Sequence, residues 1–326
     1  MSFHRRALLA SAGALVAGRE AFAQAQPAWP SRPVSVLVPF APGGSTDFVA
    51  RLIAQEFSTI FGQQFVVDNR PGASGTVAAG ALARARPDGY TLAVMPNGTF
   101  AMAPSLFPLS YDNATAFTPI GLIATNAMFI CVAPDAPWQN LGQLIEASRA
   151  APGRISFGSA GAGVANHLGP ELLADMANIQ WLHVPYRSGA AALQDVIAKQ
   201  VQISFVDSVT AIPFLRDRTL RALAYTGDTR SPQAPDVPTV AELGFPGYRA
   251  STDFGLFAPA GTPAPIVTRL SEAMRQVMGS AATKSRLEPL AIDPVGGTAE
   301  AFGPYMQAES TKWGELIRKR NIRPES

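Results

Sequence analysis

Residues 38–47, with the sequence VPFAPGGSTD, combine residue types that could bind an anion. Strand-like hydrophobic residues precede them, and the helical pattern FVARLIAQEFSTIF follows. Gly43 and Gly44 allow a ligand to approach the backbone closely, and the Ser-Thr-Asp run after them contains helix-capping residue types. Free N–H groups in the first turn of a helix would favour an anion at this loop. A tight turn with an ordinary helix cap is the alternative.

Four other segments repeat the order of strand, small polar residues and helix start. They are residues 96–100 (PNGTF), 157–168 (FGSAGAGVANHL), 184–193 (VPYRSGAAAL) and 205–210 (FVDSVT). Ligands of open α/β sheets bind beyond the carboxyl ends of the strands, so these loops are expected to line one cleft. Opposed helix N-termini would favour a ligand with a carboxylate at one or both ends.

Several single side chains in these loops have two interpretations. Arg187 could hold a carboxylate through two hydrogen bonds, or it could be a surface residue in an ion pair. Asp47 and Asp207 could accept hydrogen bonds from a ligand hydroxyl or amino group, although Asp47 could equally cap a helix. His167, at a helix start, and His183, in an alternating strand, are expected to be structural.

Known catalytic and metal-binding motifs are absent from the sequence. Residues 72–76 (GASGT) fail the G-x-S-x-G pattern at its last position, and residues 161–166 (GAGVAN) lack the final glycine of a dinucleotide-binding loop. Three histidines and one cysteine leave too few ligands for a zinc site. We therefore expect no metal and no cofactor. A serine nucleophile that uses His167 or His183 stays open, and with it an exported α/β hydrolase.

The N-terminus predicts export. Two arginines at positions 5 and 6, an apolar run over residues 7–17 and an A-x-A pattern ending at Ala23 are typical of a secretory signal peptide over residues 1–23. Export by the general or the twin-arginine route stays open. Removal of this segment takes away three arginines and one glutamate, so the net charge falls from +2 to zero. Without a basic patch, nucleic acid and anionic lipid are not expected partners.

Strand-like and helix-like segments alternate along the rest of the chain, which predicts parallel sheets with helices on both faces. Two βαβαβ groups are expected, over residues 30–125 and 126–230. Two extended segments, 117–134 and 248–263, are expected to pass between them. The prediction is therefore a two-lobed α/β protein with a cleft, in which residues 24–125 and 250–326 form one lobe and residues 126–249 form the other.

The chain resembles the Bug-type receptors, the periplasmic solute-binding proteins of tripartite tricarboxylate transporters. The resemblance is carried by VPFAPGGSTD and, in the family's order, by residues 68–92, 158–173, 183–205, 235–248 and 254–263. It implies a two-lobed type II periplasmic-binding-protein fold without catalysis. It further implies a small carboxylate ligand held between the lobes, largely by backbone donors and bridging water.

The loops and the resemblance together define the candidate ligand-binding residues: Phe40, Ala41, Pro42, Gly43, Gly44, Ser45, Thr46, Asp47, Asn97, Thr99, Ser159, Ala160, Gly161, Gly163, Val164, His167, Tyr186, Arg187, Ser188, Gly189 and Asp207. The implied partner is a membrane permease, and a monomer is the simplest expectation. A sensor that reports its ligand to a signalling partner is the alternative function.

The sequence departs from the family pattern at a few positions. Phe100 stands where a histidine is usual, Val164 where a serine is common, and Asp253 where a tryptophan is usual; the order at residues 186–189 is Tyr-Arg-Ser-Gly. If Phe100 and Val164 both face the pocket, its edge is more apolar. The ligand is then expected to have an aromatic or aliphatic body rather than to be citrate.

Overall fold

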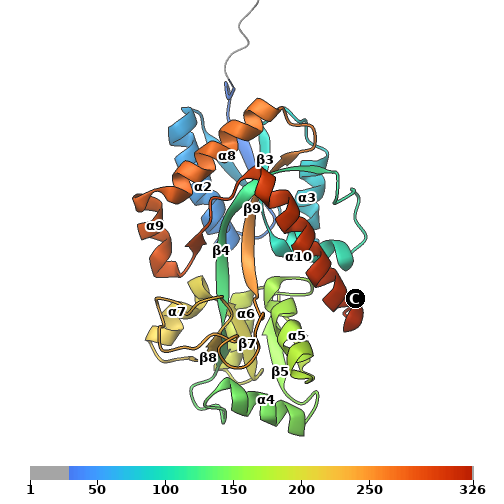
Figure 1. Ribbon diagram of the computed structural model, residues 1–326, viewed down its shortest axis with the longest axis vertical. Coiled ribbons are helices and arrows are strands. Elements are labelled where there is room, and N and C mark those ends of the chain that lie inside the picture. Colours follow the sequence, from blue (N-terminus) through green and yellow to red (C-terminus); the bar gives the residue numbers. More distant parts are fainter. Residues whose placement is uncertain (1–28, 325–326) are drawn as a thin grey trace, which may run out of the picture.

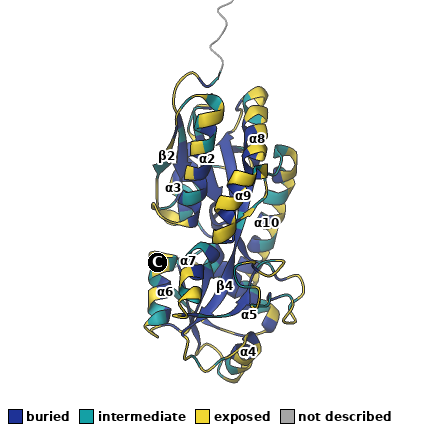
Figure 2. Ribbon diagram, turned by 90° about the vertical axis from the view of Figure 1, so that its left-hand side faces the viewer, coloured by how far each residue is buried: buried dark blue, intermediate teal, exposed yellow. Residues whose placement is uncertain are grey.

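The computed structural model describes residues 29–324, which form an elongated α/β molecule with two halves, one above the other in Figure 1. The strands follow the order β2-β1-β3-β9-β4-β7-β5-β6, and β8 and β10 also pair with β4. Figure 2 shows buried strands between helices whose outer faces are exposed. The predicted signal peptide lies outside the described residues.

The upper half contains the first strands and the C-terminal helices. Its elements are β1 (Val34–Val38), α2 (Ser45–Phe61), β2 (Phe65–Asn69), η1 (Ala73–Gly75), α3 (Thr76–Ala83), β3 (Thr91–Pro96), η2 (Gly98–Met102), η3 (Ala103–Ser105), α8 (Ala264–Gly279), α9 (Ala281–Leu287), η4 (Glu288–Leu290), β10 (Asp293–Pro294) and α10 (Ala299–Lys319). Strands β2, β1 and β3 are parallel.

The lower half is a second set of parallel strands with its own helices. Its elements are α4 (Leu141–Ala150), β5 (Ser156–Ser159), α5 (Ala165–Ala177), β6 (Leu182–Pro185), α6 (Gly189–Ile197), β7 (Ile203–Asp207), α7 (Ser208–Arg216) and β8 (Arg221–Tyr225). Strand β5 is parallel to both β6 and β7.

Two long strands, β4 (Phe117–Val132) and β9 (Ser251–Pro259), run through both halves and pair with each other in antiparallel orientation. Strand β9 is also antiparallel to β3, and β4 is antiparallel to β7. The sheets are therefore mixed: parallel strands in each half, as predicted, lie beside two connecting strands that are antiparallel to their neighbours. The reason is that these two strands join the halves directly, without the crossover helix that makes neighbouring strands parallel.

Helix α2 shows why the sequence folds as it does in this region. Its apolar residues Val49, Leu52, Ile53 and Phe57 recur at helical spacing and are buried. The helix ends at Gly62, which has a φ of +66°, a conformation that suits glycine. The hydrophobic face fixes α2 against the sheet and thereby aims its N-terminus at the gap between the halves.

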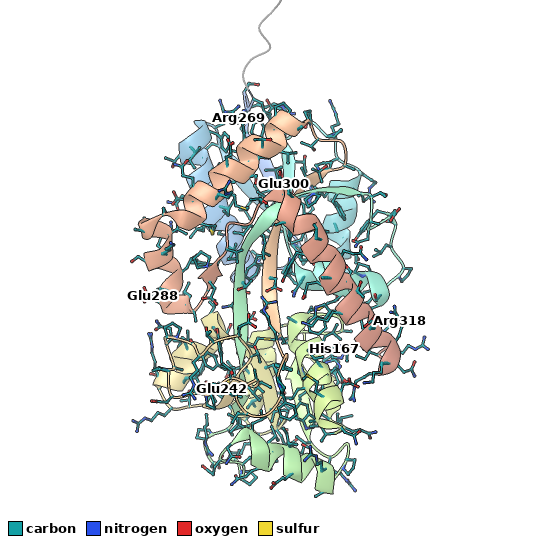
Figure 3. The ribbon with its side chains drawn as sticks, in the orientation of Figure 1. His167, Glu242, Arg269, Glu288, Glu300 and Arg318 are labelled. Carbon is teal, nitrogen blue, oxygen red and sulfur yellow. The ribbon has the colours of Figure 1, made fainter. Side chains whose placement is uncertain are left out.

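Helix α10 connects the two halves along the side of the molecule that faces the viewer in Figure 1. It begins in the upper half and ends beside α5, and Figure 3 shows Arg318 near the end of α10 at the level of His167. Lys319 Nζ lies 2.7 Å from Asp175 Oδ2, and Arg320 Nε lies 2.6 Å from Glu171 Oε2. The C-terminal helix is thus ion-paired to the helix whose other end reaches the gap.

One hydrophobic core cluster is shared between the halves: it contains Leu37 and Met95 from above and Leu168 and Phe205 from below. We retain the predicted lobe division as a proposal, with its boundaries within β4 and just before β9. Across residues 29–324, no helix combines the length and the hydropathy needed to cross a membrane.

Candidate ligand-binding site

A cavity of about 390 Å³ lies between the two halves, lined by the loops that follow the strands. The predicted residues that line it are Phe40, Ala41, Pro42, Gly43, Gly44, Ser45, Thr46, Asp47, Asn97, Ala160, Val164, Arg187, Ser188, Gly189 and Asp207. Loops from the upper and the lower half therefore face the same space.

The N-terminus of α2 forms the upper wall of the cavity. Its N-cap, Gly44, has no side chain that could accept the free N–H groups of the first turn. Gly43 has a φ of +94°, which strains any other residue, whereas Gly44 has an ordinary φ of −89°. No atom lies within 4 Å of a Cβ built at either position. At Gly44, glycine is a favoured N-cap residue, and a side chain there would point into open space.

Asp47 fastens this loop. Its Oδ2 accepts hydrogen bonds from Gly43 N at 3.0 Å and Arg51 Nε at 2.9 Å, and its Oδ1 accepts one from Asn69 Nδ2 at 3.0 Å. Burial raises the pKa of this carboxyl, but the three hydrogen bonds outweigh burial and the net pKa is lowered. Asn69 Nδ2 also donates to Phe40 O at 2.9 Å. These contacts favour the structural interpretation of Asp47 over ligand binding.

Two helix N-termini open on the cavity from the lower half. Val164 is the N-cap of α5 and provides no side-chain cap, while Ser188 is the N-cap of α6 and its side chain accepts from Ala191 N. The partial positive charges of both helix ends, together with that of α2, converge on one space. Arg187 also lines it, and within residues 29–324 no acidic side chain pairs with Arg187. The surface ion pair considered for this arginine is therefore not observed.

Asp207, at the end of β7, is linked to the upper half and to the connecting strand. Ser45 Oγ donates to its Oδ2 at 3.1 Å, and Thr252 Oγ1 donates to its Oδ1 at 3.1 Å. Burial raises the pKa of Asp207, and the two hydrogen bonds only partly offset that effect. A second link between the halves joins Ser74 Oγ to Ala162 O at 2.7 Å.

The remaining predicted residues, Thr99, Ser159, Gly161, Gly163, His167 and Tyr186, do not line the cavity. Ser159, the last residue of β5, is fully buried, whereas the next residue, Ala160, lies in the loop after the strand and reaches the cavity. Thr99 is also fully buried and donates to Ser74 O. Tyr186 donates its hydroxyl to Asp195.

The lining residues that the prediction missed are Pro96, Gly98, Ala165, Asn166, Ala190, Thr210 and Thr252. All except Thr252 lie within the loop segments that the sequence identifies, although they were not chosen as candidate residues from those segments. Thr252 lies in the connecting strand β9, and only the pairing of that strand with β4 brings it to the cavity.

The two histidines of the described chain stack behind the loop that precedes α5. Their ring centroids are 3.9 Å apart, Gly163 N donates to His167 Nδ1 at 3.1 Å, and Ser159 Oγ lies 2.6 Å from His183 Nε2. Burial, followed by the nearby His183, lowers the pKa of His167 to about 3. His167 is therefore neutral near pH 7 and supports the loop.

Phe100 does not face the cavity, so the condition that both Phe100 and Val164 face the pocket is not met. It is fully buried in the core, with its ring centroid 5.4 Å from that of Phe257 and 5.8 Å from that of Phe302. The short helix η2 turns the phenyl ring away from the loop that precedes it. Of these two residues, only Val164 lines the cavity.

Asp253 is also fully buried, and it positions Asn97. Asn97 Nδ2 donates to Asp253 Oδ2 at 3.2 Å and to Ser251 O at 2.9 Å. The side chain of Asn97 is thus committed to β9, even though the residue lines the cavity. Asp253 further accepts from Tyr305 and from Arg249, which ties α10 to the same group.

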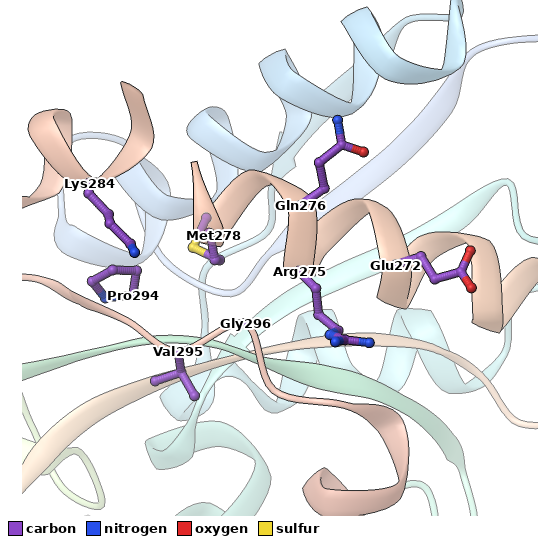
Figure 4. Close-up of a pocket in the computed structure, with 9 residues that line it drawn as sticks. Glu272, Arg275, Gln276, Met278, Lys284, Pro294, Val295 and Gly296 are labelled. Atoms are coloured by element: carbon purple, nitrogen blue, oxygen red, sulfur yellow. The ribbon is translucent and has the colours of Figure 1, made fainter. Parts of the chain in front are cut away.

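Two further cavities lie elsewhere. An open groove of about 470 Å³ beside α8 and α9 is lined by Glu272, Arg275 and Lys284, all exposed (Figure 4). A groove of about 580 Å³ lies between α5 and the end of α10. Neither groove contains a convergence of helix N-termini. In the part of the chain that the structure describes, no group of three or more His, Cys, Asp or Glu side chains is placed to hold a metal ion.

Comparison with known proteins identifies the family. Residues 49–322 match the model of the tripartite tricarboxylate transporter family receptor. The chain is 37% identical over 316 residues to the UPF0065 protein in the tcbD-tcbE intergenic region of Pseudomonas sp. strain P51, covering 96% of this chain and 94% of that protein. It is 30% identical over 293 residues to BugT of Bordetella pertussis, covering 89% of this chain and 90% of BugT.

Solved structures agree with the sequence relatives. R. palustris Rpa4515 with adipate superposes with a TM-score of 0.84 at 34% identity, covering 91% of this chain and 100% of that one. MatC (Rpa3494) from Rhodopseudomonas palustris with bound malate superposes with a TM-score of 0.80 at 33% identity, covering 89% of this chain and 100% of MatC. The fold and the family inferred from the sequence are thereby confirmed. The chain belongs to the tripartite tricarboxylate transporter receptor family, whose members include the periplasmic Bug solute-binding proteins.

Proposed function

We propose that this protein captures a small organic carboxylate in the cavity between its halves and presents it to a membrane permease. The observation that supports this most directly is the convergence of the N-termini of α2, α5 and α6, with Arg187, on one cavity. Helix N-termini and a guanidinium are donors that stabilise an anion. Two similar structures are described with adipate and with malate, both of them carboxylates.

Binding is proposed to be coupled to closure of the two halves. A ligand that contacts α2 above and α5 and α6 below stabilises the arrangement in which all three helix ends are close. The hydrogen bonds from Ser45 to Asp207 and from Ser74 to Ala162 add to this arrangement. A permease that contacts both halves would recognise the closed form. We further propose that the protein is exported through the signal peptide over residues 1–23 and acts as a monomer.

We propose that the protein has no catalytic activity. The pair of Ser159 and His183 is the one observation that favours the hydrolase alternative, since their side chains lie 2.6 Å apart. Ser159 is fully buried and does not line the cavity, so its hydroxyl is out of reach of a ligand there. A Ser159→Ala variant that abolished measurable hydrolysis of a generic ester would support the hydrolase.

A thermal-shift screen tests the proposed function. Residues 24–326 would be unfolded and refolded to remove carried-over ligand, and then mixed with adipate, malate, citrate, benzoate, glucose and a cationic amine. A carboxylate at 100 times its dissociation constant should stabilise the protein by about 2.7 kcal/mol. A response to glucose or to the amine, without a response to any carboxylate, would contradict the proposal.

A further inference from the structure

The two acidic side chains of the cavity differ in how fully their oxygens are used. Asp47 and Asp207 are the acidic residues that line it within residues 29–324. Asp47 accepts three hydrogen bonds, one of them from the charged Arg51. Asp207 accepts two, one on each oxygen, and both donors are neutral hydroxyls. A carboxylate has about four acceptor positions, so Asp207 retains free acceptor capacity inside the cavity.

Within residues 29–324, the Asp207 carboxylate has no cationic partner and is poorly solvated, so a hydrogen-bond donor on the ligand would stabilise it. No Lys, Arg or His of the described chain lies within 4.0 Å of its carboxylate. Burial raises the pKa of this carboxyl because its charge is poorly solvated. A group that donates a hydrogen bond would replace the missing solvation, whereas a second carboxylate at this position would be repelled.

We propose that Asp207 determines the specificity of the cavity by selecting carboxylates that also carry a hydroxyl or amino group. The ligand carboxylate binds the helix N-termini of the lower half and Arg187, and its hydroxyl or amino substituent donates to Asp207. This inference rests on the proposed carboxylate site and narrows its substrate class. The other donors of the cavity, such as Ser188 and the backbone N–H groups of α5 and α6, serve the carboxylate itself.

A different role for the same contacts is a latch that holds the halves together. Ser45 lies on α2 and Asp207 at the end of β7, so their hydrogen bond joins the two halves whether or not Asp207 touches the ligand. A latch would strengthen the binding of every ligand by the same factor. A selector would strengthen only the binding of ligands that carry the donor. The two roles therefore predict different ratios of affinities.

Titration calorimetry on the refolded mature protein at pH 7.5 distinguishes them. The probes are two series with matched carbon skeletons: succinate, malate and aspartate, and adipate, 2-hydroxyadipate and 2-aminoadipate. In the series that fits the cavity, a hydroxyl or amino member should bind about tenfold or more tightly than the unsubstituted acid, because one charge-assisted hydrogen bond is added. Asp207→Asn should reduce that ratio to less than about threefold.

Two control variants remove the hydroxyl donors and keep the carboxylate. Ser45→Ala and Thr252→Val should change the affinity of all members of a series by a similar factor and leave the ratio intact. Thermal unfolding and circular dichroism would establish that each variant is folded. Equal binding of substituted and unsubstituted acids by the wild-type protein would overturn the inference and leave the proposed function standing. An equal loss for all acids in Asp207→Asn would also overturn it, in favour of the latch. Failure of all six acids to bind would contradict the proposed function itself, and the inference with it.

Discussion

Gly163 N donates a hydrogen bond to Nδ1 of His167 at 3.1 Å, so the loop that lines the cavity is fastened to an imidazole that must remain unprotonated at that nitrogen. The residue His167 is only 3% exposed, and its ring stacks on the ring of His183. Protonation would remove the acceptor of the Gly163 amide and place a charge in a poorly solvated site.

The stability of the protein should therefore fall in mild acid through His167. Its pKa is lowered from 6.5 to about 3 in the folded state, so below pH 6.5 the unfolded chain binds a proton that the folded chain does not. This group costs up to about 1.4 kcal/mol of stability per pH unit between these two values. Urea unfolding of the wild type and of His167→Gln gives the difference between their free energies of unfolding. This difference should shift by roughly 2 kcal/mol in favour of the variant when the pH falls from 7.5 to 5. A difference that stays constant with pH would contradict this account.

Gly43 should be required for binding more than for folding. Gly43→Ala places a side chain at a φ of +94° and beside the free N–H groups of α2, so we expect moderate strain of about 1–2 kcal/mol and a loss of carboxylate binding. Gly153→Ala is the matched control, because Gly153 has a φ of +71°, has open space around its Cβ position and does not line the cavity. If calorimetry finds equal affinities for the two variants, the loop is no part of the site.

Arg187 should contribute directly to carboxylate affinity. Arg187→Ala is expected to weaken binding by roughly 1.5–3 kcal/mol, the range for a hydrogen bond to a charged group. Arg286→Ala is the control, since Arg286 is an exposed arginine paired with Glu56 away from the cavity. Titration with the best carboxylate of the screen would measure both variants. If Arg187→Ala changes the binding free energy by less than about 1 kcal/mol, Arg187 does not contact the ligand.

Asp253 should be important for stability. Asp253→Ala leaves the guanidinium of Arg249 and the amide of Asn97 without their buried acceptor, so we expect a loss of about 3–5 kcal/mol. Asp228→Ala removes the other acidic partner of Arg249. The Asp228 side chain is 73% exposed, so this change should cost less than about 1 kcal/mol. Denaturant unfolding of both variants provides the comparison. Similar losses would mean that Arg249 does not depend on the buried carboxylate.

Val164→Ser should change both the helix and the ligand preference. A serine at the N-cap of α5 can accept a first-turn N–H, which stabilises the helix by about 1 kcal/mol. The same hydroxyl accepts an N–H group that would otherwise be free to bind a ligand, and it makes the cavity edge more polar. We expect weaker binding of acids with a long aliphatic body relative to citrate, measured by calorimetry. An unchanged order of affinities would remove Val164 from the determinants of specificity.

The sequence by itself determined several strand–loop–helix units and the start of the helix after residues 38–47, because hydrophobic periodicity and capping residues act within a few positions of the chain. Residues 40–47 could therefore be assigned to a helix N-terminus, and the cavity is in fact lined by them. The helical pattern over residues 48–61 lies within α2 as observed.

Only the tertiary structure decided which side chain of each loop faces the cavity. Ser159 and Ala160 are neighbours of similar size, and their opposite placement depends on how β5 lies in the sheet. Thr252 reaches the site through the pairing of β9 with β4, and Phe100 enters the core because Phe257 and Phe302 are there to receive it. These contacts join residues more than one hundred positions apart, and local patterns carry no information about such pairings.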